Sequence, residues 1–335
     1  MFRTISRRAI LVSALMVPAI VACADESSPT APVLPAKPNL GIGAVVKVTN
    51  TSGGTATGSL RWAVKTAGDQ GAITFDPSLA GKTITLDSTL HVTKFLYFEG
   101  PTDKGITFSG GGNVRVMQID QGAWLSNLNI TNGFDPIMAA GILATGGELT
   151  VQHTAVFDNR APNAAGVYLD GVATFMNSTI ARNTASGIGS GISYTNRSRI
   201  TLVNVTINGN GPAPGIASHY RGDYTPVVFL NNSIIAGNSN QNCYTLFGFV
   251  YQGRNLSDDS SCGDASKLLI ADAKLGELRD NGGPSATIAL QRLSPAINAA
   301  TNCLVTIDQR HAPRDANCDI GAFEVTSGKG GRGGK

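Results

Sequence analysis

The sequence predicts an all-β chain whose body is a right-handed parallel β-helix, a three-sheet solenoid with a short N-terminal capping helix and a disulfide-bearing C-terminal region. Through the middle of the chain, apolar residues alternate with small or polar ones, which is the periodicity of strands. These segments recur every 24 to 28 residues. One such repeat cannot bury its apolar face alone, so we expect repeats to stack, from about residue 84 to 262.

Two apolar series keep one frame through the repeats. We expect each to form an interior row, with one residue per coil and about 4.8 Å between coils. Length differences must then be absorbed in corners such as residues 211–214, where we expect Ala213→Asp to be nearly silent. The first row is Ile130, Val156, Ile180, Ile207 and Ile235; the second is Leu125, Val151, Phe175, Leu202 and Leu230.

Asparagine and glycine punctuate the strands, and both tolerate the left-handed backbone of sharp corners. We expect the first asparagine series below to form a ladder of side-chain amides, in which His153 is a tolerated polar substitute rather than a catalytic residue. A leucine-rich repeat is the main rival, but it needs a helix or a tight leucine pattern in each repeat, and this composition disfavours helices. The series are Asn127, His153, Asn177, Asn204 and Asn232; Asn159, Asn183, Asn210 and Asn238; and Gly141, Gly166, Gly191 and Gly215.

The N-terminal residues have the pattern of a targeting segment. Three arginines precede an apolar run over residues 9–21, which is too short to span a bilayer. Residues 20–23 resemble the lipobox of bacterial lipoproteins, which implies a signal peptide over 1–23, lipid on Cys23 and a Pro/Ser-rich tether over 24–44. The alternative is ordinary cleavage after Ala24 and release of a soluble protein.

The remaining cysteines, in an exported chain, predict disulfides. Three pairings are open, and we favour Cys243–Cys262 and Cys303–Cys318 because each brackets a short segment.

Charge argues against a nucleic-acid partner. The chain carries a formal charge of +3, but three arginines lie in residues 1–23 and three cations in the flexible Gly-rich basic tail over 326–335. The part between is therefore slightly acidic and lacks the basic footprint of a nucleic-acid binder.

Residues 58–64 resemble the "CSLREAI" motif that opens many secreted β-helix proteins, with Gly58 replacing Cys and Trp62 replacing Glu. Ser59 is a suitable N-cap for a helix that buries Leu60, Ala63 and Val64. Such a helix would cover the open end of the solenoid. We therefore assign 45–100 to the N-terminal cap and first coils, and 101–265 to the β-helix repeats.

Residues 275–284 resemble the "LGPLQDNGGPT" signature, and the segments 294–298, 308–310 and 318–324 follow in the matching order. Together they resemble the choice-of-anchor Q domain of bacterial surface proteins, which implies a pectin-lyase-like body and a cell-surface location. Residue Ile288 stands where His is frequent, Asn298 where Asp is frequent and His311 where Gly is frequent. We assign 266–325 to this region.

No catalytic constellation is evident. The predicted fold houses polysaccharide lyases and hydrolases, which need clustered acids, but the acids of the repeats are scattered, and we expect no catalytic residue, metal or cofactor. The best candidate for ligand binding is the outer face of the strands that follow the glycine series. The alternative is that this face is an ordinary solvated surface without a ligand. Its residues are Tyr168, Asp170, Ser193, Thr195 and His219.

We therefore expect a monomeric lipoprotein on the outer membrane or cell surface, or a secreted protein, that binds glycans or another surface ligand without catalysis. The alternative is a polysaccharide lyase or glycoside hydrolase. Asp158 and Arg182 hold equivalent positions in neighbouring coils, so we also expect a surface ion pair there.

Overall fold

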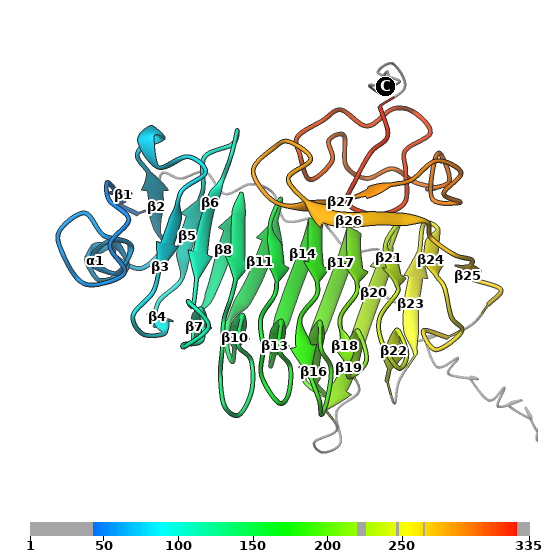
Figure 1. Ribbon diagram of the computed structural model, residues 1–335, viewed down its shortest axis with the longest axis horizontal. Coiled ribbons are helices and arrows are strands. Elements are labelled where there is room, and N and C mark those ends of the chain that lie inside the picture. The colour runs from blue at the N-terminus through cyan, green and yellow to red at the C-terminus, as the bar shows by residue number, and fades with distance from the viewer. Residues whose placement is uncertain (1–42, 220–225, 246–247, 264, 327–335) are drawn as a thin grey trace, which may run out of the picture. The chain divides into compact units, whose positions relative to one another are not determined.

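Parallel strands stack coil upon coil into a β-helix in the computed structural model, which describes residues 43–219, 226–245, 248–263 and 265–326 (Figure 1). This confirms the predicted fold. The predicted signal peptide, Cys23 and nearly all of the predicted tether lie outside the described residues. No helix within the described ranges is long and apolar enough to cross a membrane.

Two columns of strands form one large sheet. The first column is β1 (Val45–Val48), β2 (Gly71–Phe75), β5 (Leu96–Glu99), β8 (Gly122–Ser126), β11 (Glu148–Gln152), β14 (Val172–Ala181), β17 (Arg199–Asn208), β20 (Val227–Asn231) and β23 (Phe249–Gln252). The second column is β3 (Thr83–Thr85), β6 (Ile106–Ser109), β9 (Leu128–Thr131), β12 (Ala155–Phe157), the second halves of β14 and β17, β21 (Ile234–Ala236), β24 (Asn255–Ser257) and β25 (Leu268–Ile270). The columns are joined because β14 and β17 run without a break through the corner residues Asn177 and Asn204. Two of the three expected sheets are thereby one hydrogen-bonded sheet.

The other main layer is a seven-stranded sheet. Its strands are β4 (Leu90–Val92), β7 (Met117–Ile119), β10 (Ile142–Ala144), β13 (Val167–Leu169), β16 (Ile192–Thr195), β19 (Ile216–His219) and β22 (Cys243–Tyr244). Two short strands, β15 (Thr184–Ala185) and β18 (Gly211–Pro212), pair at the corner between the sheets. Every ladder among these layers is parallel, as a solenoid requires.

Both predicted interior rows are confirmed. Val156 is in register with Ile130 on one side and Ile180 on the other, and the row continues through Ile207 to Ile235. The row from Leu125 to Leu230 is aligned in the same way in the first column. All ten side chains are at most 1% exposed. Burial of each contributes about 1.5–3 kcal/mol, so these rows dominate the core.

The asparagine ladder forms in the second asparagine series, which begins at Asn159, and not in the first series as we predicted. The first series takes a left-handed backbone, with φ of 60° at Asn127 and 46° at Asn177, and these side chains do not bond one another. The second series does: each Nδ2 donates to the next Oδ1, with distances of 2.9 Å from Asn159 to Asn183 and 3.0 Å from Asn183 to Asn210. The ladder continues through Asn238 to Asn242. The left-handed corner turns the first series outward, which leaves only the second aligned along the stack.

The glycine series is required by close packing of the backbone. A Cβ on Gly141 or Gly166 would lie 2.4 Å from the carbonyl oxygen of the next glycine in the stack.

The expectation that Ala213→Asp would be nearly silent is wrong. Ala213 is only 3% exposed and lies in a cluster of buried alanines. Ala213→Asp would bury a charge there, so the substitution should destabilise the fold.

The predicted capping helix is present as α1 (Leu60–Thr66). The Ser59 hydroxyl accepts a hydrogen bond from the Trp62 backbone N–H, and Leu60, Ala63 and Val64 are buried. A 3₁₀ turn, η1 (Pro77–Leu79), follows in the first coils. Both predicted disulfides, Cys243–Cys262 and Cys303–Cys318, are formed.

The C-terminal region, residues 271–326, packs along the side of the stack rather than over its end. It begins with an antiparallel hairpin, β26 (Leu275–Arg279) and β27 (Thr287–Leu290). Figure 1 shows this hairpin along the upper edge of the stack and the seven-stranded sheet along the lower edge. The region bonds to the outward-turned corner side chains: Asn177 donates to Ile307 O at 2.9 Å, and Asn232 donates to Thr301 O at 2.8 Å. The docking strip for this region therefore consists of His153, Asn177, Asn204 and Asn232 of the first series, whereas Asn127 donates to Gly100 O within the stack.

Candidate functional site on the seven-stranded sheet

The outer face of the seven-stranded sheet carries two rows of outward residues. Leu90, Val167 and Leu169 are among the residues that point inward, and the residues between them alternate to the outside. The first outward row is His91, Gln118, Leu143, Tyr168, Ser193, Ala217 and Tyr244. The second is Asp120, Thr145, Asp170, Thr195 and His219. Neighbouring members of a row lie about 4.8 Å apart along the stack.

The five predicted ligand residues all lie on this face, although not all are accessible. The rings of Tyr168 and His219 meet edge to face, with centroids 5.8 Å apart. Thr195 Oγ1 donates to Asp170 Oδ1 at 2.7 Å. Ser193 is fully buried, and its hydroxyl donates to the Ile188 carbonyl at 3.1 Å. Tyr168, Asp170 and His219 can therefore contact a ligand, whereas Ser193 and Thr195 hold the surface in shape.

Sequence reasoning missed a polar chain at the other end of the same face. His91 Nε2 lies 2.6 Å from Asp120 Oδ2, and Gln118 Nε2 donates to Asp120 Oδ1 at 3.2 Å. Arg115 Nη1 donates to Gln118 Oε1 at 3.3 Å, while its Nη2 pairs with Asp135 at 2.8 Å. The alternation Leu90-His91-Val92 and Met117-Gln118-Ile119 was the available signal. It was overlooked because no glycine precedes these strands as it precedes the later ones.

Asp120 and Asp170 are the two acids of the second outward row. They stand two coils apart, about 10 Å along the stack. Each carboxylate already accepts a side-chain hydrogen bond. Among the residues that the structure describes, no group of three His, Cys, Asp or Glu residues is placed to hold a metal ion. The accessible groups of this face include the rings of His91, Tyr168 and His219, the Gln118 amide and the two acids.

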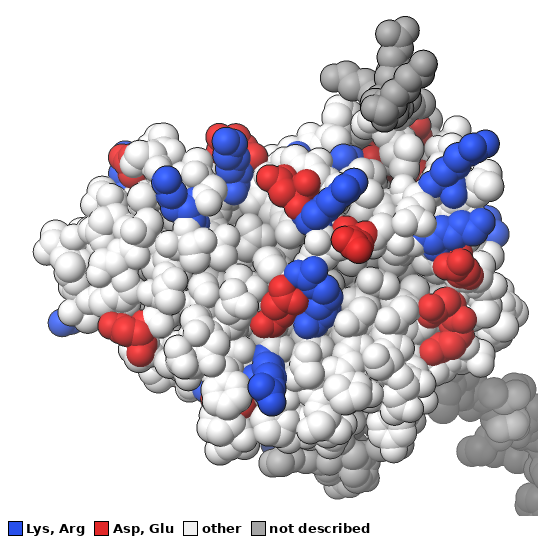
Figure 2. All heavy atoms as spheres, in the orientation of Figure 1, with Lys and Arg blue, Asp and Glu red and all other residues white. Residues whose placement is uncertain are grey.

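The predicted ion pair between Asp158 and Arg182 is confirmed. Arg182 Nε and Nη2 donate to the two Asp158 carboxylate oxygens at 3.0 and 2.6 Å. Both side chains are more than a third exposed, so the pair contributes at most about 1 kcal/mol. Figure 2 shows acidic and basic residues mixed across the visible face, without a large area of one sign.

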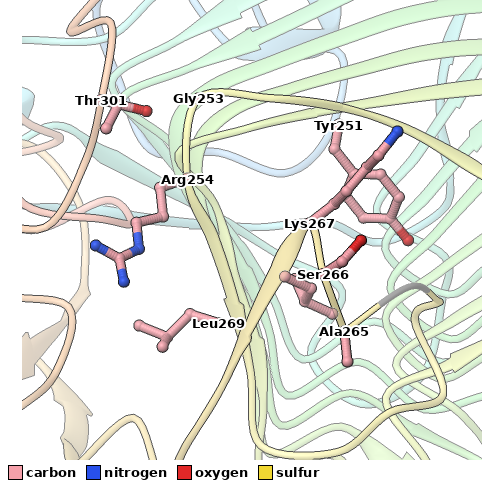
Figure 3. Close-up of a pocket in the computed structure, with 9 residues that line it drawn as sticks. Tyr251, Gly253, Arg254, Ala265, Ser266, Lys267, Leu269 and Thr301 are labelled. Carbon is pink, nitrogen blue, oxygen red and sulfur yellow. The ribbon is translucent and has the colours of Figure 1, made fainter.

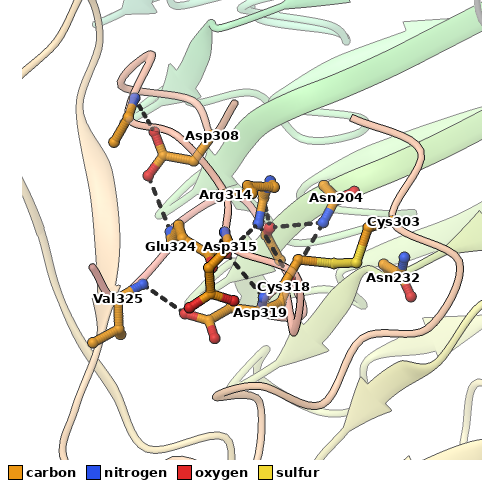
Figure 4. Close-up of polar contacts among 12 residues, drawn as sticks. Asn204, Asn232, Cys303, Asp308, Arg314, Asp315, Cys318, Asp319, Glu324 and Val325 are labelled. Atoms are coloured by element: carbon orange, nitrogen blue, oxygen red, sulfur yellow. Dashed lines mark hydrogen bonds and ion pairs between the residues drawn. A yellow bond between two sulfur atoms is a disulfide. The ribbon is translucent and has the colours of Figure 1, made fainter. Parts of the chain in front are cut away.

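The acids of the C-terminal motifs form a buried structural network (Figure 4). Arg314 Nη1 pairs with Glu324 at 3.0 Å, and both side chains are 1% exposed. Arg314 Nη2 donates to Asn177 Oδ1 at 3.1 Å, which ties the network to the docking strip. Burial raises the pKa values of Asp319 and Glu324 and lowers that of Arg314. Because backbone N–H groups and Arg314 occupy these carboxylates, the network holds the C-terminal region in place.

His153 serves the same docking contact. Its ring lies edge to face against His311 of the C-terminal region, with centroids 4.4 Å apart, and Ser285 donates to the His153 carbonyl at 2.9 Å. Burial, with a smaller contribution from His311, lowers the pKa of His153 to about 4. The residue is thus a neutral packing element at ordinary pH.

A pocket of about 520 Å³ lies at the C-terminal end of the stack (Figure 3). It is lined by Tyr251, Arg254 and Lys267, but Figure 3 shows the two cations directed to different sides. The Tyr251 hydroxyl already donates to the Cys262 carbonyl. This pocket therefore lacks groups that converge on a ligand.

Fold and surface together define a parallel β-helix protein whose seven-stranded sheet turns a polar and aromatic face outward, with Ser193 and Ala217 buried within it. No protein-family model matches the chain, and no curated protein matches it. A solved structure, pectate lyase Pel9A, is similar at 13% sequence identity with a TM-score of 0.40, over 84% of this chain and 96% of that one.

Proposed function

We propose that this protein is an exported, lipid-anchored surface protein that binds glycans through the outer face of the seven-stranded sheet without catalysis. The observation that carries the proposal is the pair of outward rows, which repeat with the coil and lie on the side away from the C-terminal region (Figure 1). Aromatic rings can pack against the C–H faces of sugars, and the adjacent amides and acids can bond their hydroxyls. The motif resemblance to choice-of-anchor Q proteins and the lipobox support the cell-surface part of the proposal.

Co-sedimentation with a panel of insoluble polysaccharides tests this. We expect wild-type protein to bind at least one polysaccharide, and Tyr168→Ala to weaken that binding about tenfold, because one aromatic contact is lost. Tyr97→Ala is the matched control, since Tyr97 lies on the first column of the large sheet. Binding that survives Tyr168→Ala, or that Tyr97→Ala reduces equally, would refute the assignment to this face.

The second candidate is a polysaccharide lyase or hydrolase, which only the shared row of Asp120 and Asp170 favours. Assays of ultraviolet absorbance and reducing ends on uronate and neutral polysaccharides would detect it. Reproducible turnover that Asp170→Asn abolishes would replace the binding proposal.

A further inference from the structure

A groove of about 460 Å³ lies across the corner loops between the second column and the seven-stranded sheet. One set of lining residues is Phe134, Arg160 and Thr184, which pair as isolated parallel bridges in consecutive coils. The prolines Pro136, Pro162 and Pro212 also line it. We call this surface the loop groove; its three bridged residues span about 10 Å along the stack.

The loop groove is held rigid from below. Arg160 and Thr184 directly follow the ladder residues Asn159 and Asn183, whose side chains bond each other at 2.9 Å. The buried alanine cluster that includes Ala161 lies in the same loops. A groove whose backbone is fixed in this way loses little conformational entropy when it binds a ligand.

Arg160 is the charged group of this groove, and it is exposed. Within the part of the chain that the structure describes, its guanidinium makes no hydrogen bond or ion pair. Arg115 and Arg182, by contrast, each pair with an aspartate. A free guanidinium offers a planar fork of donors that matches a carboxylate or sulfate group.

The other lining residues suit a carbohydrate. The Phe134 ring and the prolines present C–H surface, and the Thr184 hydroxyl can donate or accept a hydrogen bond. A mainly apolar groove with a few polar groups is the usual composition of a small-ligand site.

We propose that the loop groove binds a short stretch of a linear anionic polysaccharide, with Arg160 pairing with one carboxylate or sulfate group and Phe134 packing against a sugar ring. The inference extends the proposed glycan binding to a second surface and names the class of glycan. It does not depend on the seven-stranded sheet, so either site can fail without the other.

Calorimetric titration of the purified protein with alginate, dextran sulfate and neutral dextran tests the proposal. We expect binding to a charged polymer and not to dextran, and the comparison of the first two polymers separates carboxylate from sulfate recognition. Arg160→Gln should weaken binding about tenfold or more, because a charge-assisted hydrogen bond is lost. Phe134→Ala should weaken it as well, whereas Tyr97→Ala on the first column of the large sheet should leave it unchanged.

Arg182→Gln is the matched control. It also removes one positive charge, but from an arginine in the next coil that already pairs with Asp158. We expect it to change affinity less than twofold. An equal loss in Arg160→Gln and Arg182→Gln would show that only net charge matters and would overturn the proposal. The proposal would also be overturned if neither charged polymer bound, or if dextran bound equally well. Binding of poly-glutamate that depends equally on Arg160 would overturn it too, because the ligand would then be an acidic peptide.

Discussion

The asparagine ladder makes a sharp prediction about stability, and Asn183→Ala tests it. Asn183 is fully buried; its Nδ2 donates to Val156 O and Asn210 Oδ1, both at 3.0 Å. Its Oδ1 accepts from the backbone N–H of Asn159 at 3.2 Å and from Asn159 Nδ2 at 2.9 Å. The substitution removes all four hydrogen bonds at once.

The cost depends on which partners are left unpaired. Asn159 Nδ2 keeps its bonds to two carbonyls, and Asn210 Oδ1 still accepts from the Asn183 backbone N–H. The Asn159 backbone N–H loses its acceptor, and the Val156 carbonyl loses the amide that donates to it. The Val156 carbonyl stays on the parallel ladder of β12 with β14, so only the Asn159 N–H is left unsatisfied. One buried unsatisfied group costs about 1–3 kcal/mol and the other lost hydrogen bonds add to this, so we expect a loss of about 3 kcal/mol in the free energy of unfolding.

Urea unfolding followed by circular dichroism and by tryptophan fluorescence measures this loss. Asn208→Ala is the control, because Asn208 is partly exposed and its side chain makes one bond, to Ala236 O at 2.8 Å. We expect that variant to lose about 1 kcal/mol or less. A loss below about 1 kcal/mol in Asn183→Ala, or an equal loss in both variants, would show that the ladder does not stabilise the stack.

Three further predictions follow from the core, the docking contact and the N-terminus. Ile180→Asp should prevent folding, because it buries an unpaired charge in the stack, whereas Ile188→Asp, at a position 37% exposed, should give soluble protein; comparison of soluble yields decides this. Folding lowers the pKa of His153 to about 4. Between pH 6.5 and 4 the unfolded chain therefore binds a proton that the folded chain does not. The free energy of unfolding should fall by about 3 kcal/mol as the pH drops through this window. Urea unfolding of His153→Asn should lack that part of the pH dependence, and an unchanged slope would contradict the assignment. Mass spectrometry of the native N-terminus should find lipid on Cys23 and none in Cys23→Ser; an unmodified chain beginning at Asp25 would establish ordinary secretion instead.

The sequence by itself determined the repeating architecture. A one-residue slip would turn a buried row to solvent, so the interior rows around Ile180 and Phe175 had to stay in phase although the repeat length varies. The capping helix and both disulfides were also predictable, because each depends on residues that are close in sequence. Local patterns suffice where the interaction partner is a neighbour or the equivalent residue of the next coil.

The tertiary structure alone decided how the surfaces are used. Sequence spacing cannot say whether a corner asparagine points along the stack or away from it; the left-handed φ of Asn177 turns its amide toward Ile307, 130 residues away. The burial of Ala213, the chain from His91 to Asp135 and the loop groove around Arg160 likewise depend on which coils come side by side. These features arise from contacts between segments that share no local pattern, because side-chain direction and burial are set by the neighbours that folding brings together.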